Sequence, residues 1–89
     1  ISAVNLVANA RNVTVTANGD ISASTKGIVA TTIGTGRLDV AVGSGVTVQS
    51  TGIYGVHLTN GSANTLTNNG AISGQTGVQT TNGSVTVTN

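Results

Sequence analysis

The stretch Val13-Thr14-Val15-Thr16 decides the fold class, because it alternates apolar and polar β-branched side chains. The same alternation returns at Val46-Thr47-Val48 and at Val85-Thr86-Val87-Thr88. Successive side chains of an extended chain point to opposite sides, so each stretch places Val on one face and Thr on the other. Val, Ile and Thr make up 35 of the 89 residues, and their stiff side chains fit a pleated sheet. The sequence predicts an all-β protein, and this regular alternation argues against disorder.

Internal repeats extend this pattern along the chain. The segment 16–22 (TANGDIS) matches segment 67–73 (TNNGAIS) at five of seven positions, and residues 59–62 (TNGS) recur as residues 81–84. Residues 38–61 also align without gaps on residues 13–36. A fixed element that returns every 20–26 residues indicates a repeat architecture.

The aligned repeats define three columns of aliphatic residues, one residue of each column in every repeat. The first column contains Val15, Val40, Leu66 and Val87, and the second contains Ile1, Ile21, Val46 and Ile72. The third contains Leu6, Ile28, then Ile53 or Val56, and Val78. The gapless alignment favours Ile53, whereas the match of residues 55–56 to residues 77–78 favours Val56, and this alternative stays open.

Three short strands per repeat, each with one inward aliphatic residue, describe one coil of a parallel β-solenoid. Successive coils would stack about 4.8 Å apart, and the Gly and Asn segments would turn the corners. We therefore expect an all-β, right-handed parallel β-helix of about four coils of 20–26 residues, with an antiparallel sandwich as the alternative. The expected structural core is formed by the column residues, namely Val15, Val40, Leu66, Val87, Ile21, Val46, Ile72, Ile28 and Val78.

The composition excludes several functional classes. The formal net charge is +1 and there is no Cys, so the chain offers no basic field for nucleic acid and no thiolate metal site. No apolar run approaches the roughly 18–20 residues of a membrane-spanning helix, and we expect no membrane insertion of this segment. The sequence shows no polar capping segment at either end of the repeats. We expect residues 1–89 to be a single β-solenoid segment, either an excerpt of a longer array or a subunit that stacks end to end.

Few side chains carry chemistry. The single imidazole, His57, would need a Ser or Thr partner, of which there are many, and an orienting carboxylate to act as a catalytic base, and a solitary His on a strand is more often a surface or satisfied residue. Asp20 and Asp39 occupy different repeat positions and do not stack, so they offer neither a shared Ca²⁺ site nor the clustered carboxylates of a glycosidase. Tyr54 is either a stacking residue for a glycan or a packed one. We expect no catalytic residue, no metal, no cofactor and no enzymatic activity.

The small polar residues are expected to serve the turns. Residues 34–36 (GTG) and 43–45 (GSG) resemble phosphate-binding loops, but neither precedes a helix or a Lys, so both are expected to be coil corners. Asn18, Asn69 and the pair Asn60 and Asn82 are expected to form turn ladders that satisfy backbone groups.

Residues 51–61 (TGIYGVHLTNG), 66–74 (LTNNGAISG) and 77–89 (GVQTTNGSVTVTN) resemble the repeats of bacterial autotransporter passenger domains. Residues 13–50 resemble them more loosely. The resemblance implies a right-handed β-helix carried on the Gram-negative cell surface or secreted, often as an adhesin or aggregation factor. That family has no universal site residues, so the resemblance assigns none here.

The expected function is a structural or adhesive segment of a bacterial surface β-helix, mediating cell adhesion, self-association or fibre formation. Self-association would use end faces or flat sheets, and a host or surface ligand is a further possible partner. A passive stalk spacer is one alternative. Another is an ice-binding array, since Thr14/Thr16, Thr65/Thr67 and Thr86/Thr88 would form outward Thr-x-Thr pairs, interrupted by Asp39 and Ala41. The third alternative is a β-helix enzyme that processes glycans.

Overall fold

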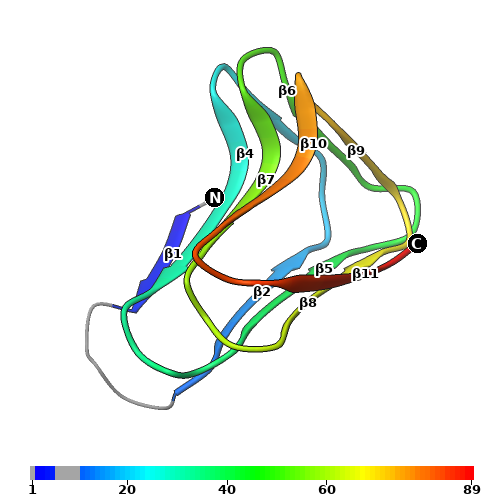
Figure 1. The fold of residues 1–89 in the computed structure, drawn as a ribbon. Coiled ribbons are helices and arrows are strands. Elements are labelled where there is room, and N and C mark those ends of the chain that lie inside the picture. Colours follow the sequence, from blue (N-terminus) through cyan, green and yellow to red (C-terminus); the bar gives the residue numbers. More distant parts are fainter. Residues whose placement is uncertain (1, 6–10) are drawn as a thin grey trace.

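The computed structural model describes residues 2–5 and 11–89, which form eleven β-strands and, within those ranges, no helix. All the strands are short, and from β2 onward short corners separate them (Figure 1). They are β1 (Ser2–Asn5), β2 (Val13–Ala17), β3 (Ile21–Ala23), β4 (Lys26–Thr32), β5 (Leu38–Val42), β6 (Thr47–Ser50), β7 (Tyr54–Thr59), β8 (Asn64–Asn68), β9 (Ala71–Ser73), β10 (Thr76–Thr81) and β11 (Val85–Thr88).

The strands pair only in parallel and form three sheets. Sheet A has the order β1-β4-β7-β10, sheet B the order β2-β5-β8-β11, and sheet C the order β3-β6-β9. The chain visits sheets A, B and C in turn, so each coil contributes one strand to every side of a three-sided solenoid (Figure 1). This topology confirms the predicted parallel β-solenoid and excludes the antiparallel sandwich.

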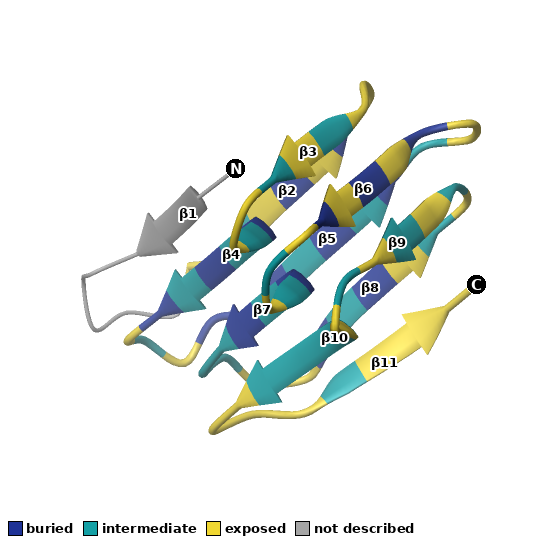
Figure 2. Ribbon diagram, turned by 90° about the horizontal axis from the view of Figure 1, so that it is seen from above, coloured by how far each residue is buried: buried dark blue, intermediate teal, exposed yellow. Residues whose placement is uncertain are grey.

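The coils advance in a right-handed sense, with β1 and β11 at opposite ends of the stack (Figures 1 and 2). The described strands complete three turns and add only β10 and β11 of the next. The count is therefore about three turns rather than the expected four.

The first aliphatic column is confirmed in register. Val15 pairs with Val40, Val40 with Leu66, and Leu66 with Val87. The first three members are buried, but Val87 is 49% exposed, so the expectation that it is buried is wrong. Val87 lies on β11, which pairs with β8 on one side and has no described strand on its other side.

The prediction for the second aliphatic column is wrong at one position. Ile21 pairs with Val48, and Val48 pairs with Ile72, so Val48 takes the place that was assigned to Val46. The reason is an insertion in the corner between β5 and β6. The sequence separation between paired residues of the first two turns is two residues larger in sheet C than in sheet B. Val46 is still buried, because the longer corner between β5 and β6 turns its side chain into the core.

The third column contains Val56 and not Ile53. Ile28 and Val78 both pair with Val56, whereas Ile53 lies in the corner before β7 and is 45% exposed. One further inserted residue between β6 and β7 moves the register again, which a gapless alignment cannot show.

Glycine is required at Gly27 and Gly55, where the chain turns from sheet C into sheet A. Gly27, Gly55 and Gly77 each precede the inward residue of the third column. A Cβ on Gly55 would lie 2.6 Å from Cγ2 of Ile72 and 2.8 Å from the carbonyl oxygen of Gly77, closer than any side chain tolerates. The repeated Gly-aliphatic pair therefore marks the true register of this column.

The core is one aliphatic cluster that runs through the stack (Figure 2). Of the expected core residues, Val15, Ile28, Val40, Val46 and Leu66 are buried, and Ile21, Ile72 and Val78 are half-buried against the cluster. The expected members Ile1 and Leu6 lie outside the described residues. Residues 34–36 and 43–45 form coil corners, as predicted.

Candidate interaction surfaces

The outer side of sheet B presents a regular array of threonine side chains. It is built from two columns, Thr14–Asp39–Thr65–Thr86 and Thr16–Ala41–Thr67–Thr88, whose members pair between successive strands. We call these eight residues the threonine face. Strands in a sheet lie about 4.8 Å apart and alternate residues about 6.6 Å apart, so the columns form a grid. The structure thus confirms the predicted alignment of the three Thr-x-Thr pairs and their interruption by Asp39 and Ala41.

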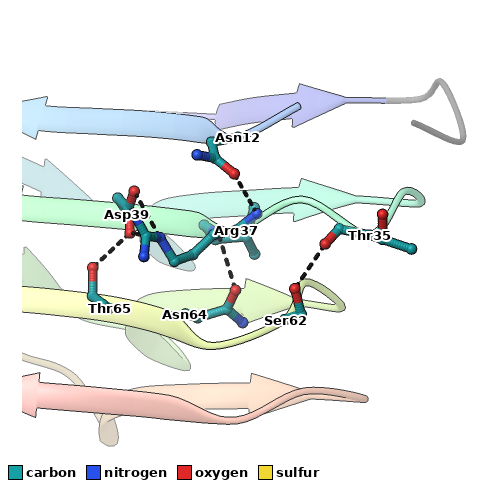
Figure 3. A network of polar contacts seen from close by, with 8 residues as sticks. Asn12, Thr35, Arg37, Asp39, Ser62, Asn64 and Thr65 are labelled. Atoms are coloured by element: carbon teal, nitrogen blue, oxygen red, sulfur yellow. Dashed lines mark hydrogen bonds and ion pairs between the residues drawn. The ribbon is translucent and has the colours of Figure 1, made fainter. Parts of the chain in front are cut away.

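The single carboxylate on the threonine face is compensated locally. The hydroxyl of Thr65 donates a hydrogen bond of 2.6 Å to Oδ1 of Asp39, and Nε of Arg37 lies 3.0 Å from the same oxygen (Figure 3). The side chain of Asp39 is 24% exposed and that of Arg37 is 48% exposed. Such an exposed pair contributes little to stability. It does cancel the formal charge that would otherwise interrupt the face.

The corner between sheets A and B holds the start of each sheet B strand in place. Oδ1 of Asn12 accepts a hydrogen bond of 2.8 Å from the backbone N–H of Arg37, and the hydroxyl of Ser62 donates one of 2.7 Å to the carbonyl of Thr35 (Figure 3). Nδ2 of Asn60 donates a bond of 2.7 Å to the carbonyl of Thr32. Each of these bonds joins adjacent coils, so polar side chains fix the register in which the threonine columns align.

Asn60 and Asn82 were predicted to serve turns, and both adopt positive φ, at 65° and 57°. Short polar side chains such as Asn tolerate this left-handed backbone better than other residues do. The side chain of Asn60 also bonds across coils, as a turn ladder requires. At the corner after sheet B, the backbone N–H of Asn69 bonds the carbonyl of Val42.

Asn64 was missed by the sequence interpretation. It occupies an inward position of sheet B, with Leu38 before it and Val85 after it in the stack, and it is 1% exposed. Its Oδ1 accepts a bond of 2.9 Å from the N–H of Leu38, and its Nδ2 donates one of 2.8 Å to the carbonyl of Asn60. A polar residue inside an otherwise aliphatic column was the signal that would have found it.

A second group of side chains gathers on the outer side of sheet A. The rings of Tyr54 and His57 lie with centroids 4.8 Å apart, and Nζ of Lys26 lies 5.8 Å from the centroid of the Tyr54 ring. Nε2 of His57 is 3.0 Å from Oγ1 of Thr81 and 3.5 Å from Oγ1 of Thr59. We call these five residues the His57 cluster. Tyr54 is half-buried between Lys26 and His57, so the structure favours the packed alternative over a free stacking platform.

The environment of His57 lowers the pKa of its imidazole below the usual 6.5. Burial is the larger cause, and the positive charge of Lys26 is the second. The imidazole is therefore neutral at pH 7.

The two carboxylates do not come together. Oδ1 of Asp20 accepts a bond of 2.8 Å from the N–H of Thr47 at the corner between sheets B and C, whereas Asp39 lies on the threonine face. Across residues 2–5 and 11–89 there is no group of three His, Asp or Glu side chains able to hold a metal, and no pocket. That part of the chain also has no helix long and apolar enough to cross a membrane.

The chain matches no protein-family model, and no curated protein and no solved structure matches it. The threonine face and the His57 cluster, on two sides of the solenoid, are its candidate interaction surfaces.

Proposed function

We propose that this chain is a structural segment of a bacterial surface-exposed or secreted β-solenoid, and that it mediates adhesion or self-association through the threonine face. The observation that carries this proposal is the alignment of three Thr-x-Thr pairs on one sheet, with the only carboxylate among them neutralised by Arg37. The repeat resemblance to autotransporter passenger domains supports the extracellular setting.

The geometry of the face suits contact with a second copy. Its spacing is set by the strand separation, so the grids of two copies have the same repeat by construction. Every Thr hydroxyl offers one donor and two acceptor positions, and the neighbouring methyl group adds apolar contact. Because the face has no uncompensated charge, two such faces approach without Coulomb repulsion.

The test places charge on the face without disturbing the polar network. Thr16, Thr67 and Thr88 belong to the column that contains no charged residue, so the triple variant Thr16→Lys, Thr67→Lys, Thr88→Lys leaves the bond between Thr65 and Asp39 intact. Stacked like charges on neighbouring strands should suppress association. Light scattering against protein concentration is the measurement.

Sheet C provides a matched control. Ser22, Gln49 and Ser73 are exposed and pair in register, so replacing all three by Lys adds the same charge on a different side. The proposal expects this control to associate like the wild type. Equal behaviour of the two triple variants, or a wild type that does not associate at all, would contradict it.

Ice binding is the second candidate, because the same register aligns paired Thr methyl and hydroxyl groups in a grid. Against it, the row of Asp39 and Ala41 interrupts the grid. Thermal hysteresis of the wild type, lost when Thr14, Thr65 and Thr86 are replaced by Ser, would favour this function. Absence of both hysteresis and association would leave a passive stalk spacer.

A further inference from the structure

His57 joins the last two described strands of sheet A through one of its two ring nitrogens. It lies on β7, between Val29 of β4 and Gln79 of β10. Nε2 is within hydrogen-bond distance of Thr81, which belongs to β10. Nδ1 is buried and has no hydrogen-bond partner among the described residues. The two nitrogens therefore differ: one bridges to the next coil, and the other has nothing to bond.

Nothing described around this imidazole favours a positive charge. Lys26 from β4 is a cation, and Tyr54 from β7 contributes an aromatic ring and no carboxylate. The other strands that contact β7, namely β6, β9 and β10, contribute no titratable side chain. Asp39 lies on sheet B, and Asp20 lies at the corner between sheets B and C. The pKa of His57 is accordingly lowered, first by burial and then by Lys26.

We propose that His57 makes the contact between β7 and β10 acid-sensitive, so that its protonation weakens the pairing of β10, and of the coil that β10 begins, with the coil before it. An imidazolium carries an N–H on both nitrogens. One of them would be the Nδ1–H, which would be buried without an acceptor and close to the charge of Lys26. Separation of β10 from β7 frees the ring from its bond to Thr81, so that the ring can turn both N–H groups toward water and remove this penalty.

The hydrogen bond of Nε2 determines which strand contact responds. His57 lies between β4 and β10, and Nε2 bonds Thr81, which belongs to β10. The acid response is therefore expected in the contact between β7 and β10 rather than in the contact between β4 and β7.

The direction of the pH effect follows from the lowered pKa. Above about pH 6.5 the imidazole is neutral in both the closed and the open coil, and the contact has its full stability. Between this value and the lower pKa of the closed coil, the open coil binds more protons, so stability falls as the pH falls. Opening exposes the edges of β7 and β8, which are templates for pairing with another chain. This association would use the backbone edges of β7 and β8 rather than the outer side of sheet B, and it does not depend on the proposed function.

The experiment uses His57 as its own probe, because it is the only imidazole of the chain. The proton on Cε1 of His57 is titrated by NMR from pH 8 to pH 4.5, and amide hydrogen exchange is compared at pH 7.5 and pH 5.0 after correction for intrinsic rates. We expect a His57 pKa below about 6.5. We also expect protection of β10 and β11 to fall by up to about tenfold per unit of pKa shift, while β4 and β5 stay unchanged.

Three variants separate protonation from packing. His57→Gln cannot be protonated and should abolish the pH dependence of β10 and β11. Lys26→Gln should raise the pKa of His57 and reduce that dependence, whereas Arg37→Gln, with the same change of charge beside sheet B, should leave the pKa unchanged.

A His57 pKa at or above about 6.5 would overturn the proposal. Unchanged protection of β10 at pH 5.0 would do the same, as would a His57→Gln variant that retains the full acid response. The wild-type titration and the Lys26→Gln comparison still decide the matter if His57→Gln does not fold.

Discussion

The side chain of Asn64 accepts a hydrogen bond of 2.9 Å from the backbone N–H of Leu38, 26 residues earlier in the chain. The bond spans two coils within the buried start of sheet B, and the other half of the same amide bonds the carbonyl of Asn60. One buried side chain thus satisfies the buried N–H of Leu38 and the part-buried carbonyl of Asn60.

Replacement of Asn64 by Ala should therefore lower the free energy of unfolding by about 1–3 kcal/mol, because it leaves the N–H of Leu38 and the carbonyl of Asn60 unpaired. Asn12→Ala is the matched control. Asn12 makes the analogous bond to the N–H of Arg37, but both residues are exposed, so water can replace the lost acceptor. Urea unfolding measures both variants, and an equal loss in the two would refute the assigned role of burial.

Gly55 should tolerate no side chain. The Cβ of a Gly55→Ala variant would meet Ile72, the carbonyl of Gly77 and the carbonyl of Ser73 within 2.9 Å, and two of these contacts are backbone atoms that cannot move aside. We expect a loss of about 1–3 kcal/mol or more. Gly19→Ala is the control, because no atom lies within 4 Å of its Cβ position and its φ is negative. Gly19→Ala should be neutral or stabilise by about 0.4–1 kcal/mol. Similar denaturation midpoints for the two variants would contradict the tight turn.

The same truncation at two levels of one column should have different effects. Val40 and Val87 both belong to the first aliphatic column, but Val40 is 2% exposed and Val87 is 49% exposed. Val40→Ala should cost about 2–4 kcal/mol, and Val87→Ala less than about 1 kcal/mol. Calorimetric melting of the two variants tests this. A large loss at Val87 would mean that its side chain is covered in solution.

The alternation of Val and Thr in β2 and β11, together with inward aliphatic residues at the matching positions of β5 and β8, was sufficient to predict the register of sheet B. Val15, Val40, Leu66 and Val87 were therefore aligned correctly, and so were the outward threonines. The error at Val46 and the open choice between Ile53 and Val56 have one physical origin. Corners on the outside of a solenoid accept inserted residues without disturbing the core, so a gapless comparison loses the register after each insertion.

The His57 cluster could not be predicted for a different reason. Tyr54 and His57 are three residues apart, which in a regular strand places them on opposite faces. They share the outer side of sheet A because Gly55 and Val56 both turn inward where the chain bends into β7. The third member, Lys26, is brought there by strand pairing 28 residues away, and no local pattern carries that information.

Completing the threonine face should strengthen the association that we propose for it. The double variant Arg37→Gln, Asp39→Thr removes the ion pair without changing the net charge, and it continues the column of Thr14, Thr65 and Thr86 through the interrupted coil. Because the pair is exposed, the stability should change by no more than about 1 kcal/mol. Light scattering should then rise at a lower protein concentration than for the wild type. The single variant Asp39→Thr provides the comparison, because it builds the same column but leaves the charge of Arg37 uncompensated beside the face, and it should associate less than the double variant. If both variants scatter like the wild type, sheet B is not the contact surface, and the adhesive function must be sought on another side of the solenoid.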